Sequence, residues 1–305
     1  IGFGIDGYTL NGGFENQSGA VIGAEARAVS YNAVQATGVS NAYAKAGAEN
    51  QYVQAYGVRA GYDSSSVFNG DFVNAGGISA AAYGLIENQA TATAAGGEAT
   101  AASYIDGFGV SATGVYASFV TVGGDFINEG TVTADATAIG RSRATANGAS
   151  AAAGDELAVG ALAEGIDFSA GLMFGDFVND GDVTARAVAS LDSHNIATAT
   201  SGSAQAGGGV DSFMGTSSTS GTQAVAEAYG VVAGFGSALL GAFENNGQVT
   251  AEALANVVYA ASAAGTSMAY AEAEASGAAR AQGVGVFGNH IDYGIGNSGG
   301  IDALA

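Results

Sequence analysis

The chain contains no cysteine, no proline and no tryptophan in 305 residues. Without cysteine there is no disulfide, no zinc–thiolate centre and no attached haem. Proline cannot donate to a β ladder, so its absence is typical of a chain made almost entirely of paired strands. Glycine and polar residues interrupt every apolar stretch before about 18 residues, which predicts no membrane insertion. No secretory signal opens the chain at Ile1, and we interpret it as a processed or excised segment.

Basic residues are also scarce. Seven Lys and Arg stand against 28 Asp and Glu, for a net charge of -21. A polyanion needs Lys and Arg to displace its counterions, so nucleic acid is not an expected partner, and neither is an anionic membrane surface. Two histidines leave little for transition metals. Soluble cations, calcium above all, are still possible ligands.

A short box recurs six times, beginning near residues 14, 72, 126, 177, 243 and 295. An aromatic or aliphatic residue is followed two positions later by Asn, and in five copies an Ile or Val follows that Asn by four residues. The residues that define the box are Phe14, Asn16, Phe72, Asn74, Phe126, Asn128, Phe177, Asn179, Phe243, Asn245 and Asn297. Box spacing varies between 51 and 66 residues. We therefore interpret residues 1–305 as one array of irregular repeats of about 50–66 residues.

Two further elements complete each repeat. A Gly-Val or Gly-Ile pair opens a run before each inner box, at Gly57-Val58, Gly114-Val115, Gly165-Ile166 and Gly230-Val231. An alanine-rich tract follows each box. In residues 132–138 the apolar residues take one parity and the polar residues the other, which indicates a strand with one buried face. Alanine itself favours helix, and residues 249–282, where glycine is sparse, keep helix as an alternative.

These features predict an all-β fold, a parallel β-helix (β-solenoid). We expect each repeat to form two or three coils of roughly 20 residues, hence a rod of about fifteen coils, roughly 70 Å long. The box Phe would fill corners of a thin Ala, Val, Ile and Gly core. The box Asn would bond neighbouring backbone in a turn or form a stacked amide ladder. The glycines that follow it would adopt positive φ: Gly76, Gly130, Gly181 and Gly247.

The last box, Gly294-Ile295-Gly296-Asn297-Ser298-Gly299-Gly300-Ile301, resembles the Asn-Ser-Gly-x-Ile element of bacterial secreted β-solenoids. With the alternating alanine tracts, the chain is similar to autotransporter passengers and filamentous-haemagglutinin-like surface proteins. The resemblance covers most of the chain as a pattern. It implies an extracellular or cell-surface location and a structural or adhesive role, and it carries no catalytic residues over.

Candidate ligand sites are few. Asp71, Asp125 and Asp176 each precede a box Phe, and in stacked repeats they would line one edge as weak calcium candidates; no other cofactor is expected. The run Gly2 to Tyr8 is similar to one calcium-binding nonapeptide, without tandem copies. Outward threonine pairs could form an ice-binding or polymer-binding array: Thr91 with Thr93, Thr131 with Thr133, and Thr198 with Thr200.

Catalysis is not expected. We expect no nucleophile elbow of the kind that a catalytic serine needs, and we interpret His194 and His290 as loop residues. Asp155-Glu156, the only adjacent acidic pair, has the pattern of a solvated loop. A glycosidase or lyase would need an acidic cluster or a basic residue placed in a groove. We therefore predict that the protein is not an enzyme.

Both ends of the chain have the sequence of interior repeat. Uncapped solenoid edges pair with further strands, so we expect copies of the chain to join head to tail, residues 1–25 of one meeting 284–305 of the next. The function expected is that of an extracellular structural protein that forms a filament or surface fibre. Two alternatives stay open: a shaft segment of a larger bacterial adhesin, and a glycan- or ice-binding solenoid.

Overall fold

A computed structural model describes residues 1–305 except 6, 8, 62–65 and 208–221, and every regular element in that part is a β-strand. All strand pairs are parallel, and they form three sheets wound as one solenoid. The expected all-β parallel β-helix is confirmed. Helix is wrong for residues 249–282, which lie in β19, β20 and β21, because the apolar residues keep a period of two there.

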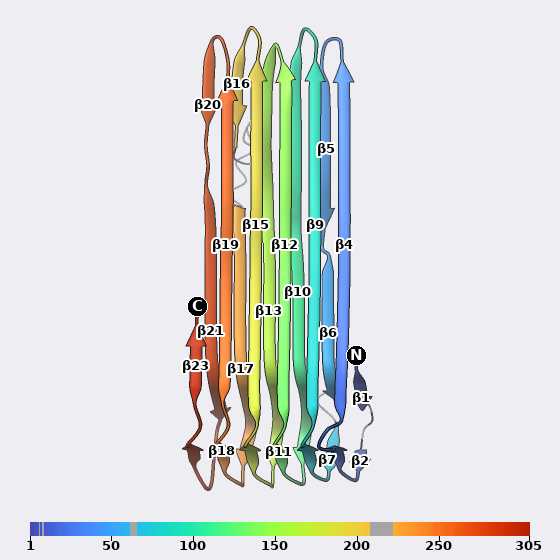
Figure 1. Cartoon of the computed structure of the whole chain (residues 1–305), viewed down its shortest axis with the longest axis vertical. Helices are drawn as coiled ribbons and strands as arrows, with labels where there is room; N and C mark the ends of the chain where they lie inside the picture. The colour runs from blue at the N-terminus through green and yellow to red at the C-terminus, as the bar shows by residue number, and fades with distance from the viewer. Residues whose placement is uncertain (6, 8, 62–65, 208–221) are drawn as a thin grey trace.

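One coil climbs a long strand, turns, descends a second long strand and crosses a short base strand (Figure 1). The ascending sheet comprises β4 (Val21–Gly38), β9 (Gly77–Ala94), β12 (Thr131–Gly148), β15 (Asp182–Ala199), β19 (Val249–Ala264) and β23 (Ile301–Leu304). The base sheet comprises β3 (Phe14–Asn16), β8 (Phe72–Asn74), β11 (Phe126–Asn128), β14 (Phe177–Asn179), β18 (Phe243–Asn245) and β22 (Ile295–Asn297).

The descending sheet contains the remaining eleven strands. They are β1 (Phe3–Ile5), β2 (Thr9–Asn11), β5 (Ala42–Glu49), β6 (Tyr52–Ala60), β7 (Val67–Asn69), β10 (Glu98–Val122), β13 (Ser150–Met173), β16 (Ser203–Ala206), β17 (Thr222–Leu239), β20 (Met268–Ala271) and β21 (Ala275–Gly288). The base strand of each coil runs from the aromatic or aliphatic residue of the repeated box to its Asn.

Each repeat makes one coil, so the expectation of two or three coils per repeat is wrong. Phe126 pairs directly with Phe72 on one side and with Phe177 on the other. Strands of 18 to 25 residues replace the short strands of an ordinary solenoid. At about 3.3 Å per residue β10 is roughly 80 Å long, whereas six box strands at about 4.8 Å stack to only about 25 Å. The molecule is a tall, thin plank and not a rod of fifteen coils.

Differences in repeat length fall outside the base. The extra residues of the 66-residue repeat fall in the sequence between Ala206, which pairs with Ala153, and Gln223, which pairs with Ala158 on the same uninterrupted β13. Strands above and below the insertion therefore stay in register with one neighbour. Length also varies in the turn between the box and the ascending strand, where the first repeat has two more residues than the second, while the box strands stay in register.

The core changes character along the coil. Two alanine-rich clusters fill the space between the ascending and descending sheets, and a third cluster at the base contains the phenylalanines. Ala134, Ala136 and Ala138 of β12 are fully buried, as the period of two predicts. Small side chains let the ascending and descending sheets approach closely. Near the base sheet, the interior also holds the phenylalanine rings of the third cluster.

A column of glycines on the descending sheet receives a column of β-branched residues from the ascending sheet. A Cβ on Gly165 would lie 2.3 Å from Val183 Cγ1, and one on Gly114 would lie 2.4 Å from Val132 Cγ1. The Gly of the Gly-Val opening and the Ile or Val after the box are thus two sides of one contact. The same pairing is made by Gly57 with Ile78, Gly230 with Val249, and Gly283 with Ile301.

The glycines after the box Asn do not adopt positive φ, so that expectation is wrong. They are required by the neighbouring coil instead. A Cβ on Gly130 would lie 1.9 Å from the carbonyl oxygen of Gly76, and one on Gly181 equally close to that of Gly130. Backbone of adjacent coils meets here without room for a side chain.

Replacing Gly165 by Ala tests the contact between the long sheets. Because the new methyl overlaps Val183, we expect Gly165→Ala to lower the free energy of unfolding by about 1–3 kcal/mol. Gly160→Ala on the same strand is the control, since its Cβ meets nothing closer than 3.9 Å. Thermal and denaturant unfolding followed by circular dichroism measures both; equal midpoints for the two variants would contradict the proposed close packing.

Candidate functional site

The box asparagines form a continuous amide ladder through all six coils. Each Nδ2 donates to the Oδ1 of the next coil, at 2.7 Å from Asn74 to Asn128 and 2.6 Å from Asn128 to Asn179. The other rungs join Asn16 to Asn74, Asn179 to Asn245 and Asn245 to Asn297. The four inner asparagines are completely buried. The ladder has a direction, because every amide donates toward the C-terminal end.

The box phenylalanines stack beside the ladder. Ring centroids are 4.8 Å apart between Phe72 and Phe126 and 4.6 Å between Phe126 and Phe177, with planes within 7° and 5° of parallel. Phe14 and Phe243 continue the column at its two ends, and Ile295 follows Phe243 in register. These rings fill the corner that the sequence assigns to them.

Each of the three aspartates of the column bonds the backbone of the next coil. Asp71 Oδ1 accepts the backbone N–H of Asp125 at 3.0 Å, and Asp125 Oδ1 accepts that of Asp176 at 2.8 Å. Asp176 Oδ1 in turn accepts the N–H of Ala242. No group of three acidic, histidine or cysteine side chains converges on a metal-sized site in the described part of the chain. A calcium role for these carboxylates stays a prediction; their backbone bonds are the contacts present. Asp6 and Tyr8 of the nonapeptide-like run lie outside the described residues.

The threonine pairs are dispersed. Thr131 and Thr133 lie at the base end of the ascending sheet, whereas Thr91 and Thr93 lie near its upper end. Thr198 is in β15, and Thr200 lies beyond the end of that strand. The pairs therefore do not align as a single array.

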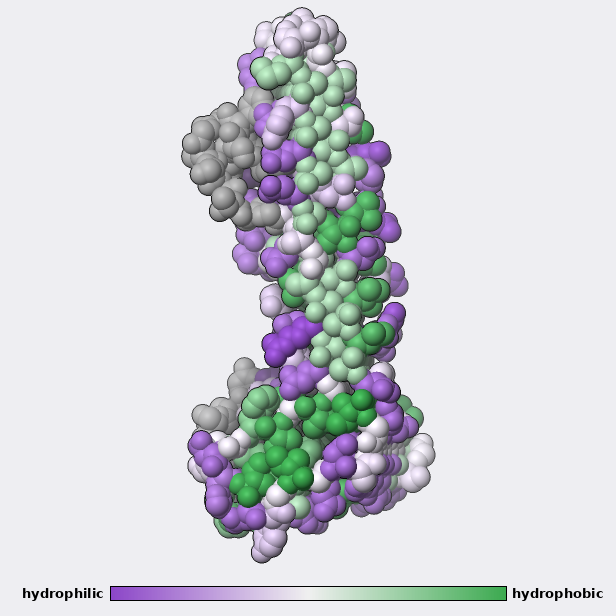
Figure 2. Space-filling view, turned by 90° about the vertical axis from the view of Figure 1, so that its left-hand side faces the viewer, coloured by the Kyte–Doolittle hydropathy of each residue, from purple (hydrophilic) through white to green (hydrophobic). Residues whose placement is uncertain are grey.

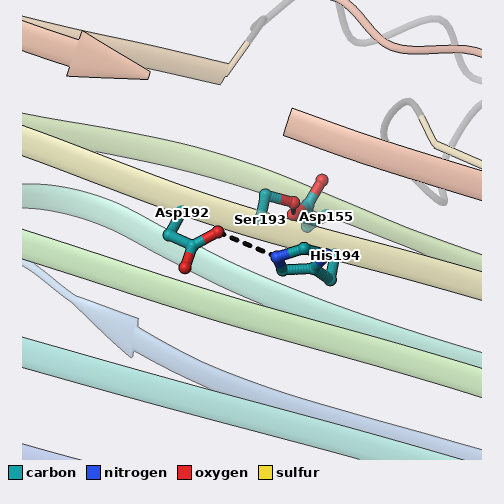
Figure 3. A network of polar contacts seen from close by, with 4 residues as sticks. All are labelled: Asp155, Asp192, Ser193 and His194. Atoms are coloured by element: carbon teal, nitrogen blue, oxygen red, sulfur yellow. Dashed lines mark hydrogen bonds and ion pairs between the residues drawn. The ribbon is translucent and has the colours of Figure 1, made fainter. Parts of the chain in front are cut away.

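His194 lies inside β15, so the loop expectation for it is wrong, whereas His290 does lie outside the strands, after β21. Figure 3 shows His194 with Asp192, its Nε2 3.0 Å from Asp192 Oδ1, while Ser193 turns to Asp155. Neighbours on a strand face opposite sides of the sheet. Ser193 and His194 are consequently separated by the sheet and do not form a catalytic pair.

Asp155 is buried in the core, at 3% exposure, so its assignment to a solvated loop is wrong. Its carboxylate accepts hydrogen bonds from Asn195 Nδ2 and Tyr259 Oη, each at 2.9 Å, and contacts Ser193 Oγ. Desolvation raises the pKa of Asp155, and the hydrogen bonds from its neighbours act in the opposite direction.

The surroundings of Asp155 form a polar layer that crosses the core. Asn88 and Ser142 are buried in register with Ser193 on the ascending sheet, and Ser103 faces them from the descending sheet beside Asp155. This layer separates the two alanine-rich clusters. The detectable sequence signal is that Asn88, Ser142 and Ser193 take the inward parity in tracts where that parity is otherwise apolar.

Glu164 and Asp167 form a second acidic pair, on the outer face of the descending sheet. Burial raises the pKa of Glu164 to about 7, with a further contribution from the negative charge of Asp167. Thr113 Oγ1 donates a hydrogen bond to Glu164 Oε2 at 3.2 Å and opposes the shift. Burial also raises the pKa of Asp167.

Stability should therefore fall between pH 4.5 and 7. In that range folded Glu164 keeps a proton that the unfolded chain has released, so raising the pH favours unfolding. We expect Glu164→Gln to reduce the loss of unfolding free energy between pH 5 and pH 8 by about 1–3 kcal/mol. Denaturant titrations at both pH values measure this, with exposed Glu98→Gln as control. An unchanged pH dependence in Glu164→Gln would contradict the assignment.

Interrupting the amide ladder should destabilise the stack. Asn128→Ala leaves Asn74 Nδ2 and Asn179 Oδ1 buried without their partner, for an expected loss of about 2–4 kcal/mol. Asn147→Ala, near the upper end of the following strand β12 and only partly buried, is the control. Unfolding midpoints report the difference, and a tolerated Asn128→Ala would mean that the ladder contributes no net stability.

Comparison with known proteins gives no assignment: no family model matches the chain, and neither a curated protein nor a solved structure is significantly similar to it. Among the described residues there is also no helix long and apolar enough to span a membrane.

Proposed function

We propose that the chain is an extracellular structural subunit whose end coils stack on further copies to build a fibre. The observation that carries the proposal is the fit between the two ends: strands missing from one end coil are supplied by the other. The fold supports a scaffold role, because its ordered columns are internal contacts that hold coils together. The charge of -21 would keep such fibres apart in solution.

Apolar side chains are concentrated at the two ends of the stack. Of the 21 large hydrophobic residues exposed in the described part of the chain, nine lie in residues 1–52 and nine in 254–304. Figure 2 views the C-terminal end and shows an apolar strip running along the plank above a broader apolar area near the base. Ala255, Val257 and Ala261, core residues by position, are only partly buried there. Such a surface is characteristic of an interface.

Backbone hydrogen-bonding groups are also open at the ends. Among the described strands, β4 pairs with β9 alone and β21 with β17 alone. β19 is covered by β23 along no more than Val249–Glu252. Unpaired strand edges of this length are templates for another strand.

The overhangs of the two ends are complementary. At the N-terminal end β1 extends the descending sheet beyond β6, whereas at the C-terminal end β22 and β23 extend the base and ascending sheets. In the proposed joint, three strands from the N-terminal end of one copy meet three strands from the C-terminal end of the other. β1 would pair with the free edge of β21, β3 with β22, and β4 with β23. Because β1 and β23 are short and lie near the base, they fill only the lower part of the joint. Above them, one strand position would stay unfilled in the ascending sheet and one in the descending sheet.

The amide ladder sets the polarity of this joint. Asn297 Nδ2 reaches only the carbonyl of Gly299, at 3.2 Å, and within the described residues no group donates to Asn16 Oδ1. In the proposed joint Asn297 of one copy donates to Asn16 of the next. The contact joins two different surfaces, so it propagates without closing.

Electron microscopy of the purified chain tests the proposal. We expect ribbons, and X-ray diffraction from aligned ribbons should show a reflection near 4.8 Å along the ribbon axis, because the strands lie across it. Ile295→Lys places a charge on the exposed end of the Phe column and should reduce assembly, measured as sedimentation at several concentrations. Phe174→Lys, similarly exposed in an inner coil, should assemble normally.

The competing occupant of the open ends is more solenoid of the same chain, as in an adhesin shaft. Single planks at every concentration, or equal assembly by Ile295→Lys and the parent chain, would overturn the head-to-tail proposal. If assembly requires calcium, Asp71, Asp125 and Asp176 would be assigned as calcium ligands.

A further inference from the structure

Six of the seven basic residues have a partner. Four lie over aromatic rings, and two face carboxylates. These pairs are Arg27 with Tyr83, Lys45 with Tyr104, Arg59 with Tyr56, Arg280 with Tyr229, Arg186 with Glu252 and Arg141 with Glu87. Arg143 is the exception: no ion pair or ring contact engages it in the described part of the chain. An unengaged guanidinium is notable where acids outnumber bases fourfold.

Arg143 lies in an open depression on the outer face of the ascending sheet. The depression has a volume of about 300 Å³, and its outward-facing lining includes Glu87, Gln89, Arg141, Arg143, Asp192 and His194. Strand register places Gln89 and His194 on either side of Arg143. Asp192 holds the His194 ring from the same strand, as Figure 3 shows.

Charge is distributed unevenly within the depression. Arg141 stands between Glu87 and Asp192 in register, so two carboxylates offset its charge. Arg143 stands instead between an amide and an imidazole. The two arginines and two carboxylates of the depression balance in charge, but no carboxylate stands in register beside Arg143, so its guanidinium donors are available to a ligand. A guanidinium binds a carboxylate through two parallel hydrogen bonds.

An aromatic side chain lies beside the same row. Tyr31 pairs with Glu87 in register and is 68% exposed on the outer face of the sheet. It stands two strand positions from the Arg141–Arg143 strand, about 10 Å away at the spacing of a β-sheet. Tyr presents an apolar ring with a polar tip, and the carboxylate of Glu87 and amide of Gln89 can bond hydroxyl groups between the ring and the guanidinium.

We propose that this surface binds a sugar carrying a single carboxylate, of the uronic or sialic acid type, within an otherwise neutral glycan. The carboxylate would pair with Arg143, the hydroxyls with Gln89 and Glu87, and a neighbouring sugar ring would lie on Tyr31. A densely charged polyanion is excluded as ligand, because the chain carries -21 and would repel it. The outer sheet face stays open when end coils stack. Arg143, Gln89 and Glu87 lie on the inner strands β12 and β9, away from the joint, and only Tyr31 lies on the end strand β4.

Isothermal titration calorimetry with defined oligosaccharides tests the site. The probes are a glucuronic acid-containing disaccharide, sialyllactose, and each sugar with its carboxylate reduced to an alcohol. We expect at least one acidic sugar to bind, and the one that does identifies its type; its reduced counterpart should bind about tenfold or more weakly. Binding by neither acidic sugar at millimolar concentration would overturn the proposal.

The matched variants are Arg143→Gln and Arg27→Gln. Both remove one positive charge from the same sheet face, but Arg27 already rests on Tyr83. Arg143→Gln should weaken binding about tenfold or more, Tyr31→Ala should weaken it less, and Arg27→Gln should leave it unchanged. Equal losses in the two arginine variants would show non-specific attraction and refute the site. Equal binding of a short glutamate peptide would refute recognition of a sugar.

Discussion

Stacking of successive coils in register is the constraint on which the structure depends. Parallel strands about 4.8 Å apart bring the same position of each repeat to the same place, so a residue that suits one coil must suit its neighbours. Phenylalanine meets this condition because flat rings stack on each other, as Phe126 does on Phe177. Asparagine meets it because its amide donates a hydrogen bond to one neighbouring coil and accepts one from the other, as in the bond from Asn128 to Asn179. The box is the part of the repeat where this requirement is strictest.

The interior between the long sheets follows from the same constraint. Alanine and glycine allow close approach, but a uniform alanine tract matches itself equally well when shifted by two residues. The polar layer around Asp155 distinguishes the correct register from a shifted one, because Asp155 can accept hydrogen bonds from Asn195 and Tyr259 only when the strands are in that register. The glycine column that receives Val132 and Val183 supplies another near the base. Burial of a carboxylate thereby has a structural use in fixing register.

The sequence was sufficient for the fold class and for the columns, because alternation with period two and a recurrent Phe-x-Asn box are local signals. It did not predict one coil per repeat: alanine alternates evenly through the long strands and marks no point at which they should end. Asp155 was misassigned because its partners Asn195 and Tyr259 are 40 and 104 residues away. His194 and Arg143 come together only through strand register, which single-sequence spacing does not contain. The residues of the amide ladder and the Phe column could be predicted from the repeat, whereas contacts between the ascending and descending sheets could not.

The length of the strands determines how the protein bears mechanical load. Tension along the stacking direction runs parallel to the hydrogen bonds between coils, and β12 pairs with β15 without interruption from Thr131 to Gly148. All bonds across such a boundary share the load, together with those of the descending sheet and the base. Peeling from one edge would instead break them in sequence. A plank of this shape should therefore resist stretching far better than it resists unzipping.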